Sequence, residues 1–167
     1  NTYEITVYYY QDCINGNPPA LEGDNPLYVS IFNGPNFFSF DSIYVDESEV
    51  LPSQNPNSCE SSNTPTCIKK VKFTIIKNLP PSTEEYLIIN ERCCMSEAIS
   101  NISLPGTLGH AFYCKIPPSN QGINNSASFA PVSNTKFCVG KKYIIDHSAT
   151  DPDGDSLSYG FDLLDKG

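Results

Sequence analysis

The sequence predicts an all-β fold: a disulfide-stabilised, immunoglobulin-like β-sandwich followed by the first strands of a second immunoglobulin-like or cadherin-like module. Ten Tyr and nine Phe accompany many Ile and Val residues, a composition that favours strands over helices. Fourteen Pro and ten Gly interrupt the chain every few residues, as turns between short strands require. A length of 167 residues is enough for one good core, or for one domain and part of a second.

Alternation of apolar and polar residues marks the expected strands. Residues 2–10 and residues 70–77 show it most clearly. The side chains expected to face the core are Tyr3, Ile5, Val7 and Tyr9 in the first of these strands and Val71, Phe73 and Ile75 in the second. Similar composition predicts further strands at residues 27–32, 37–45, 86–92 and 110–116.

Two stretches between the strands are expected to have other structures. Residues 46–66 are acidic and then rich in Ser, Asn and Pro, so we predict a long surface loop closed by a pairing of Cys59 with Cys67. Residues 95–102 are the only candidate for one or two helical turns.

The cysteines predict an exported, disulfide-bonded protein. Neither the C-x₂₋₄-C knuckle of a zinc site nor a C-x-x-C redox motif is present. The odd count leaves one thiol free or paired outside the chain, and spacing alone does not give the connectivity. The seven residues are Cys13, Cys59, Cys67, Cys93, Cys94, Cys114 and Cys138.

The charge balance narrows the range of partners. Ten basic residues stand against nineteen acidic ones, a formal net charge of −9. Nucleic-acid binding requires clustered Lys and Arg, so no nucleic-acid partner is expected, and an anionic membrane surface is disfavoured for the same reason. No apolar run approaches the roughly 20 residues of a membrane-spanning helix, so no membrane insertion is predicted. The strand-like start at Asn1, without a leader, suits a mature or excised piece.

A module boundary is expected in the linker-like stretch of residues 119–126. Residues 1–125 would form the disulfide-stapled sandwich, and residues 126–167 the N-terminal strands of an incomplete second module. The second part includes a probable strand directly after Cys138. Because a complete sandwich needs roughly seven strands, the second module would expose an unpaired edge suited to docking or assembly.

An acidic turn in the second module is the candidate metal site. Asp151, Asp153 and Asp155 alternate with Pro152 and Gly154. Oxygen ligands at alternate positions are how many Ca²⁺ loops begin, so Ca²⁺ is the one cofactor the sequence suggests. Pro, Asp and Gly also form turns on their own account, and a solvated turn without metal is the equal alternative. The absence of flanking helices argues against an EF-hand.

Tyr9-Tyr-Gln-Asp-Cys13 and residues 90–101 are the first two of four blocks that carry a family resemblance. They resemble the "YRDC" opening and the "ECCR-N-AI-N" block of large secreted cell-surface proteins of the Bacteroidetes, of the gliding-motility-associated adhesin type exported by the type IX system. Gln11 stands in place of the usual Arg of the first block, and Met95 and Ser96 stand where Arg and an adjoining residue usually come in the second.

The remaining two blocks follow in the same order. Residues 125–129 resemble "NSPxF", and Cys138 with residues 149–159 resembles "C…AxDPDGDSLxY", which also occurs in cadherin-like and PKD-like repeats. The resemblance implies a module of a multi-domain adhesin. Cys114 has no counterpart in the family pattern and is therefore the candidate for the odd thiol.

Other candidate sites are weaker. Tyr8 and Tyr10 are candidates for stacking on sugar rings, although strand tyrosines more often pack within the protein. His110 and His147 would matter only in an enzyme, and no known nucleophile or metalloprotease motif surrounds them. Short glycosylation motifs occur at Ser42, Asn101 and Asn124.

These observations favour a non-catalytic role as a structural or adhesive module of an extracellular bacterial surface protein or filament. Its expected partners are other modules or subunits of the same assembly, and surface polysaccharide is a further candidate. The alternative is a carbohydrate-binding module attached to a secreted hydrolase. An enzyme is the third hypothesis and would need a cleft with His110 or His147 beside a Cys or Asp.

Overall fold

The computed structural model describes the whole chain except residues 15, 17, 52–66, 131–136, 138 and 161–167. The described residues divide into two compact units, which meet in the sequence between Gly122 and Ile123.

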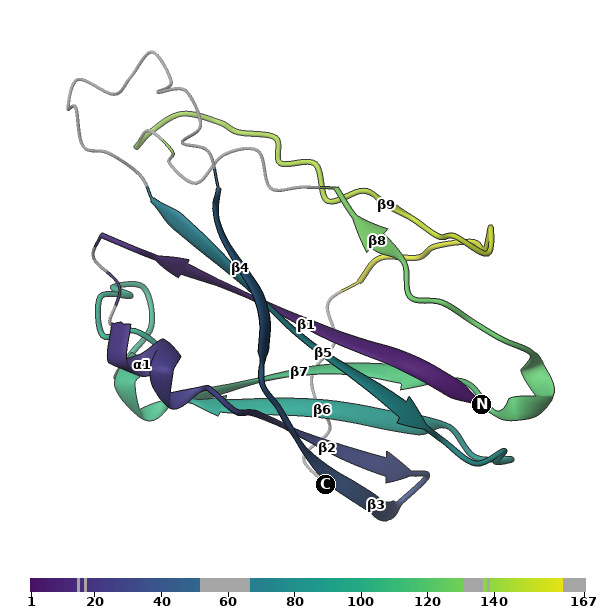
Figure 1. Cartoon of the computed structure of the whole chain (residues 1–167). Helices are drawn as coiled ribbons and strands as arrows, with labels where there is room; N and C mark the ends of the chain where they lie inside the picture. The colour runs from purple at the N-terminus through teal and green to yellow at the C-terminus, as the bar shows by residue number, and fades with distance from the viewer. Residues whose placement is uncertain (15, 17, 52–66, 131–136, 138, 161–167) are drawn as a thin grey trace. The chain divides into compact units, whose positions relative to one another are not determined.

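The described residues of the first unit form seven strands in two antiparallel sheets, which form two layers (Figure 1). The three-stranded sheet has the order β1-β5-β4, built from β1 (Thr2–Asp12), β5 (Ile68–Asn78) and β4 (Val45–Leu51). The four-stranded sheet has the order β3-β2-β6-β7, built from β3 (Asn36–Ile43), β2 (Leu27–Asn33), β6 (Tyr86–Cys93) and β7 (Gly109–Ile116). The predicted all-β sandwich is therefore confirmed.

The strand order is that of an immunoglobulin-type sandwich. Such sandwiches place strands A, B, E and D in one sheet and C, F and G in the other, with C′ added beside C in some members. Here β1 to β7 occupy the places of B, C, C′, D, E, F and G. Within the described residues, no strand occupies the place of A, which lies beside β1.

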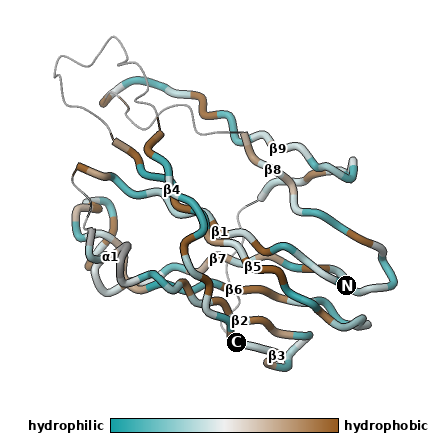
Figure 2. Tube along the Cα trace, viewed as in Figure 1, coloured by the Kyte–Doolittle hydropathy of each residue, from teal (hydrophilic) through white to brown (hydrophobic). Residues whose placement is uncertain are grey.

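The core lies between the two sheets of this unit. Ile5 and Tyr9 of β1 are buried, as are Val71 and Phe73 of β5, and Tyr3, Val7 and Ile75 pack against them. Every inward position predicted for these two strands is thus confirmed. The four-stranded sheet contributes Leu27, Val29, Ile31, Ile43, Tyr86 and Ile88. Figure 2 shows the apolar segments of β2, β5 and β6 that supply this core.

The region after β3 differs from the prediction. Residues 37–45 were expected as one strand, but the chain breaks at Tyr44, and β4 then joins the opposite sheet. The acidic residues 46–51 lie in β4 because they face lysines of β5: Lys70 Nζ lies 3.2 Å from Glu49, and Lys72 Nζ lies 3.5 Å from Asp46. The rest of the predicted loop falls outside the described residues.

The predicted pairing of Cys59 with Cys67 is wrong, because Cys67 forms a disulfide with Cys13. The pairing of Cys13 with Cys67 follows from the strand register. Asp12 of β1 lies opposite Ile68 of β5, so the cysteines directly beyond these two strand ends are adjacent. The Cys13 N–H also donates to the Cys67 carbonyl at 3.0 Å.

Helical structure occurs where the sequence did not suggest it. Residues 95–102 form no helix, only a turn at Glu97 and Ala98. The short helix α1 spans Pro18–Gly23 instead. Its two prolines occupy the first helical positions, where a missing N–H costs nothing. Two 3₁₀ turns span Pro105–Thr107 and Ser119–Gln121. Among the described residues, no helix is both long and apolar enough to span a membrane.

The second unit has little regular structure among its described residues. Its two short strands, β8 (Ser128–Phe129) and β9 (Ala149–Thr150), pair antiparallel. Residues 139–147, in which we expected a strand, belong to no sheet. The physical reason is that no described strand lies beside them and no buried apolar residue of this unit offers a core.

Candidate functional site

On the outer face of the three-stranded sheet, each strand contributes side chains of one kind: tyrosines from β1, lysines from β5 and acids from β4. The register places the exposed tyrosines of β1 opposite lysines of β5, and these lysines opposite acids of β4. The two rows are Tyr8–Lys72–Glu47 and Tyr10–Lys70–Glu49. The sequence pattern identifies the tyrosines as candidates but not the lysines and acids, because residues 46–51 were expected to lie in a loop.

The lysines of β5 lie between the tyrosines of β1 and the acids of β4 and interact with both. Lys70 Nζ donates to Glu49 Oε1 at 3.2 Å in an ion pair and also lies 4.8 Å from the centroid of the Tyr8 ring. The hydrogen bond to Glu49 raises the pKa of Lys70, and the nearby charge of Glu47 raises the pKa of Lys72. Both lysines therefore remain cationic at neutral pH.

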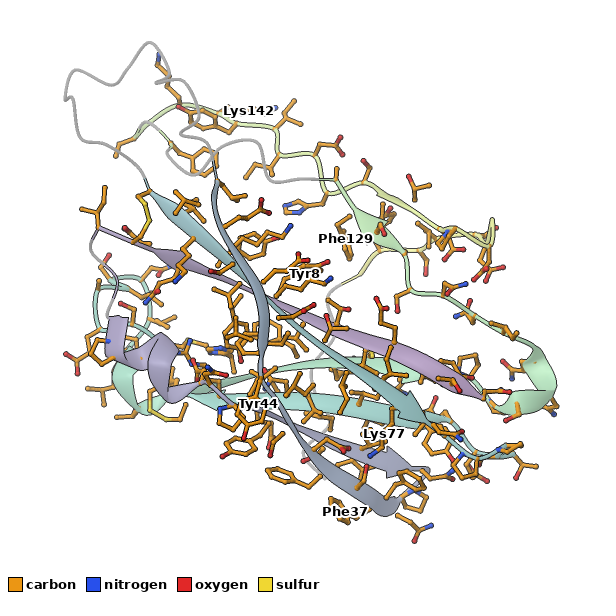
Figure 3. The ribbon with its side chains drawn as sticks, viewed as in Figure 1. Tyr8, Phe37, Tyr44, Lys77, Phe129 and Lys142 are labelled. Carbon is orange, nitrogen blue, oxygen red and sulfur yellow. A yellow bond between two sulfur atoms is a disulfide. The ribbon has the colours of Figure 1, made fainter. Side chains whose placement is uncertain are left out.

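A shallow hollow lies on this face of the sheet. Its volume is about 330 Å³, and it is lined by Tyr8, Glu47, Ser48, Glu49, Lys70 and Lys72. Tyr8 is 46% exposed and Tyr10 is 62% exposed. Figure 3 shows Tyr8 on this side of β1. An aromatic ring beside charged hydrogen-bonding groups is a combination that suits a sugar or another polar ring.

The outer face of the four-stranded sheet is aromatic. The rings of Tyr28 and Phe40 stack with centroids 5.2 Å apart and an interplanar angle of 14°. Phe37 packs edge-on against Phe32, with ring centroids 5.8 Å apart, yet remains 62% exposed. Figure 3 shows Phe37 at β3. Exposed aromatic rings gathered on one face of a sheet are typical of a surface that other molecules cover.

A polar cluster inside the first unit was not predicted. The Tyr9 hydroxyl donates to Asn90 Oδ1 at 2.7 Å, and Asn90 Nδ2 donates to the Tyr28 carbonyl at 2.8 Å. Arg92 forms an ion pair with Asp24 at 2.6 Å and lies 5.5 Å from the centroid of the Tyr9 ring. Burial raises the pKa of both Tyr9 and Asp24. The cluster joins β1 to β6 and holds the segment after α1 in place.

The predicted metal residues lie in the expected turn but are engaged with the protein. Asp151 Oδ1 accepts the N–H groups of Asp153 and Asp155, at 2.8 and 3.3 Å. Asp153 accepts both the N–H and the amide nitrogen of Asn125, and these hydrogen bonds lower its pKa. Within the described residues no cluster of three or more His, Cys, Asp or Glu side chains could hold a metal ion. Asp151 and Asp153 therefore form hydrogen bonds within the protein.

The two histidines lie in separate units. His110 of β7 packs edge-on against Phe112, with centroids 5.1 Å apart, and the alternation of the strand places Phe112 between His110 and Cys114. His147 follows Asp146, whose carboxylate accepts the N–H of Ser148 at 2.8 Å.

Cys93 and Cys94 form a vicinal disulfide, and Cys114 forms no disulfide. Cys59 and Cys138 lie outside the described residues. The candidate modification residues Ser42, Asn101 and Asn124 are all exposed.

No known protein family, curated protein or solved structure was found to match this chain.

Proposed function

We propose that this chain is a non-catalytic structural or adhesive module of an extracellular bacterial surface protein or filament. The observation that carries the proposal is the exposed aromatic face formed by Tyr28, Phe37 and Phe40 on the four-stranded sheet. Burial of apolar surface yields about 25 cal/mol per Å², so a face of this kind gives adhesion without a deep cleft.

The disulfides support an extracellular setting. Cys13–Cys67 and Cys93–Cys94 would not persist in a reducing cytosol. A crosslinked module suits a surface structure that must last where damaged domains cannot be refolded.

Location is tested by immunogold electron microscopy of unfixed cells that express the chain. We expect label on the cell surface or on filaments that project from it. Label confined to the cytoplasm, or protein recovered only as a soluble species in the medium, would refute the proposal.

Adhesion is tested with beads coated with the protein and held under flow on polysaccharide-coated and polystyrene surfaces. We expect the double variant Phe37→Ser/Phe40→Ser to detach at lower flow than the parent. The matched control is Tyr44→Ser, which removes a ring that is 67% exposed but lies between β3 and β4. If all three proteins detach at the same flow, the aromatic face does not contribute to adhesion.

Carbohydrate binding is the second candidate, as a module attached to a secreted hydrolase. It is favoured by the hollow around Tyr8 and its paired Lys70 and Glu49. A glycan array is the test: we expect saccharide binding that Tyr8→Ala and Tyr10→Ala each reduce at least tenfold and that Tyr44→Ala leaves unchanged. Binding that survives both substitutions would place any sugar site elsewhere.

Calcium binding at the acidic turn stays a prediction of the sequence. Isothermal titration with CaCl₂ up to millimolar concentration tests it. Binding would require Asp153 to release Asn125, so Asn125→Ala should tighten it. Absence of heat at millimolar CaCl₂ in both proteins would leave the turn without a metal.

A further inference from the structure

We infer that the outer face of the four-stranded sheet binds the same face of a second copy of this chain. A two-fold axis that runs across the strands relates the two copies. The inference rests on the proposed function, whose aromatic face it uses, and it names the partner of that face. Two observations carry it: the sheet is apolar on both faces, and the two charged residues of its outer face are placed to pair between copies.

The strands β2 and β6 do not alternate between apolar and polar residues. Residues 27–32 read Leu-Tyr-Val-Ser-Ile-Phe, and residues 86–89 read Tyr-Leu-Ile-Ile. A strand with one face in water has polar residues at every second position, whereas a strand covered on both faces is a near-continuous apolar run. The core covers the inner face of both strands. Their composition therefore indicates that another surface covers the outer face.

The register arranges the outer face in rows that cross β3, β2, β6 and β7 in that order. The middle row is Phe40, Ser30, Ile89 and Tyr113. The row toward one end of the strands is Phe37, Phe32, Leu87 and Lys115. The row toward the other end is Ser42, Tyr28, Glu91 and Ala111. Among these residues only Glu91 and Lys115 are charged.

The two charged side chains lie toward opposite ends of the face. Lys115 of β7 is registered opposite Leu87, four positions from Glu91 on β6, a distance of about 13 Å along the strands. Lys115 Nζ also lies 2.7 Å from Glu85 Oε1 in an ion pair that is about half exposed. An ammonium group has three N–H donors and can hold more than one acceptor, so this ion pair is compatible with a further one.

A two-fold axis along the middle row brings Glu91 and Lys115 of different copies together. The axis exchanges the two outer rows, so each Lys115 lies at the level of Glu91 of the second copy, one strand to the side. Adjacent strands are about 4.8 Å apart and packed sheets about 10 Å apart, a separation that these two long side chains bridge together. Because the contact is symmetric, the ion pair forms twice.

The same axis places large side chains opposite small ones. Lys115 lies over Ala111 of the second copy, and Phe37 lies over Ser42. A two-fold axis parallel to the strands would instead keep each row at its own level.

That second arrangement would place Lys115 opposite Phe37 and Glu91 opposite Tyr28, so both charges would be covered by aromatic rings. Covering a charge without a partner carries a large desolvation cost. The positions of the two charges therefore select the axis that runs across the strands.

The charge of the chain also favours a second copy as the partner. The formal net charge is −9, so two copies repel each other unless they meet through a neutral surface. The outer face carries one acid and one lysine, and its net charge is zero. Four strands of this length cover about 19 by about 25 Å, or about 900–1,000 Å² from two copies. This area is at the lower limit of specific interfaces, so we expect a weak dimer that dissociates at micromolar concentration.

Sedimentation velocity of the full-length protein between about 1 and about 200 µM tests the dimer. All proteins carry Cys59→Ser/Cys114→Ser/Cys138→Ser, so that disulfides between copies do not contribute. We expect the weight-average mass to rise from the 18.4 kDa of the monomer to at least about 1.5 times that value. Phe37→Ser/Phe40→Ser should remain a monomer, whereas Tyr44→Ser should dimerise like the parent.

Charge reversal tests the geometry of the dimer. Glu91→Lys gives each contact two lysines, and Lys115→Glu gives each contact two acids, so each variant alone should dimerise at least about tenfold more weakly than the parent. An equimolar mixture of the two variants should recover the affinity of the parent, because every contact then joins one acid and one lysine. The double variant Glu91→Lys/Lys115→Glu should recover it as well.

The matched controls reverse the same charges elsewhere. Glu4→Lys and Lys142→Glu change exposed residues outside the four-stranded sheet and should dimerise like the parent. Circular dichroism checks that each variant is folded. A parent that is monomeric at about 200 µM, or a reversal variant that dimerises like the parent, would overturn the inference. A mixture that does not recover the dimer would overturn it too.

Failure of this inference and failure of the proposed function give different results. If the dimer is absent but Phe37→Ser/Phe40→Ser still detaches at lower flow, the aromatic face adheres to other surfaces and the proposed function stands. If the dimer forms in solution but immunogold label is confined to the cytoplasm, the proposed function fails and the pairing of the two faces stands.

Discussion

At the scale of single residues, Tyr9 links the two sheets of the first unit through its hydroxyl. Tyr9→Phe leaves the ring in place but removes the donor to Asn90 Oδ1, which then lies in the core without that partner. We expect a loss of about 1–3 kcal/mol in the free energy of unfolding, because an unsatisfied buried acceptor keeps its full desolvation cost. Urea denaturation measures it.

The neighbouring residue provides the control for this substitution. Tyr10→Phe removes a hydroxyl from a side chain that is 62% exposed, so its effect should stay within about 0.5 kcal/mol. If both variants unfold at the same urea concentration, the Tyr9–Asn90 hydrogen bond does not stabilise the fold.

Cys114 gives a second prediction at this scale. Its residue is exposed, but surrounding protein atoms desolvate the sulfur and raise the pKa of the thiol. A raised pKa means a smaller thiolate fraction at pH 8, and the thiolate is the reactive form. Iodoacetamide should therefore alkylate Cys114 more slowly in the folded protein than in urea. Peptide mass spectrometry at timed intervals reads this site alone, and equal rates in the two states would contradict the pKa direction.

Period-two alternation was sufficient to predict which residues of β1 and β5 face the core, because side chains on a strand must point to opposite faces. The partners of polar core residues could not be predicted in the same way. Asn90 reads as an ordinary polar residue before the vicinal cysteines, and its burial is evident only once β1 and β2 lie against β6. Sequence pattern gives the face of a side chain, and only the fold gives its neighbours.

At the scale of elements, β4 shows why a charged strand is difficult to predict from sequence. Acidic residues are poor strand formers on their own, so residues 46–51 resemble a solvated loop. Their lysine partners come from β5, about twenty positions later in the sequence, and cross-strand pairs of opposite charge favour the pairing. The Tyr8 hollow was missed for the same reason, since two of its acids belong to β4.

The two described disulfides should differ greatly in their effect on stability. Cys13–Cys67 joins residues 54 apart, whereas Cys93–Cys94 joins neighbours. In the chain-entropy account, closing a long loop restricts the unfolded state more, so Cys13→Ser/Cys67→Ser should lower the free energy of unfolding by roughly 2–4 kcal/mol. Cys93→Ser/Cys94→Ser should lower it by less than about 1 kcal/mol. Thermal melting of both variants measures the two losses of stability. A larger loss for Cys93→Ser/Cys94→Ser would show that the vicinal disulfide, and not Cys13–Cys67, is the main stabilising bridge.

At the scale of the whole molecule, composition and turn frequency were sufficient to predict an all-β sandwich. The second unit was harder to predict. Residues 139–147 have the composition of a strand but lie in no sheet, because a strand needs a neighbour and a core that the described residues of this unit do not supply. Composition predicts the tendency to form a strand, and the availability of an edge decides whether one forms.

The distribution of buried residues predicts that stability belongs to the first unit. Every buried hydrophobic residue found in the structure lies between Ile5 and Ile88, and the described residues of the second unit contain none. A chain that ends at Gly122 should therefore keep the free energy of unfolding of the full chain within about 1 kcal/mol.

Both proteins carry Cys59→Ser, and the longer one also Cys138→Ser, so that thiol exchange does not intervene. Urea denaturation makes the comparison. A loss of several kcal/mol in the shorter chain would show that the second unit stabilises the sandwich within one molecule, and would contradict the separation of the two units.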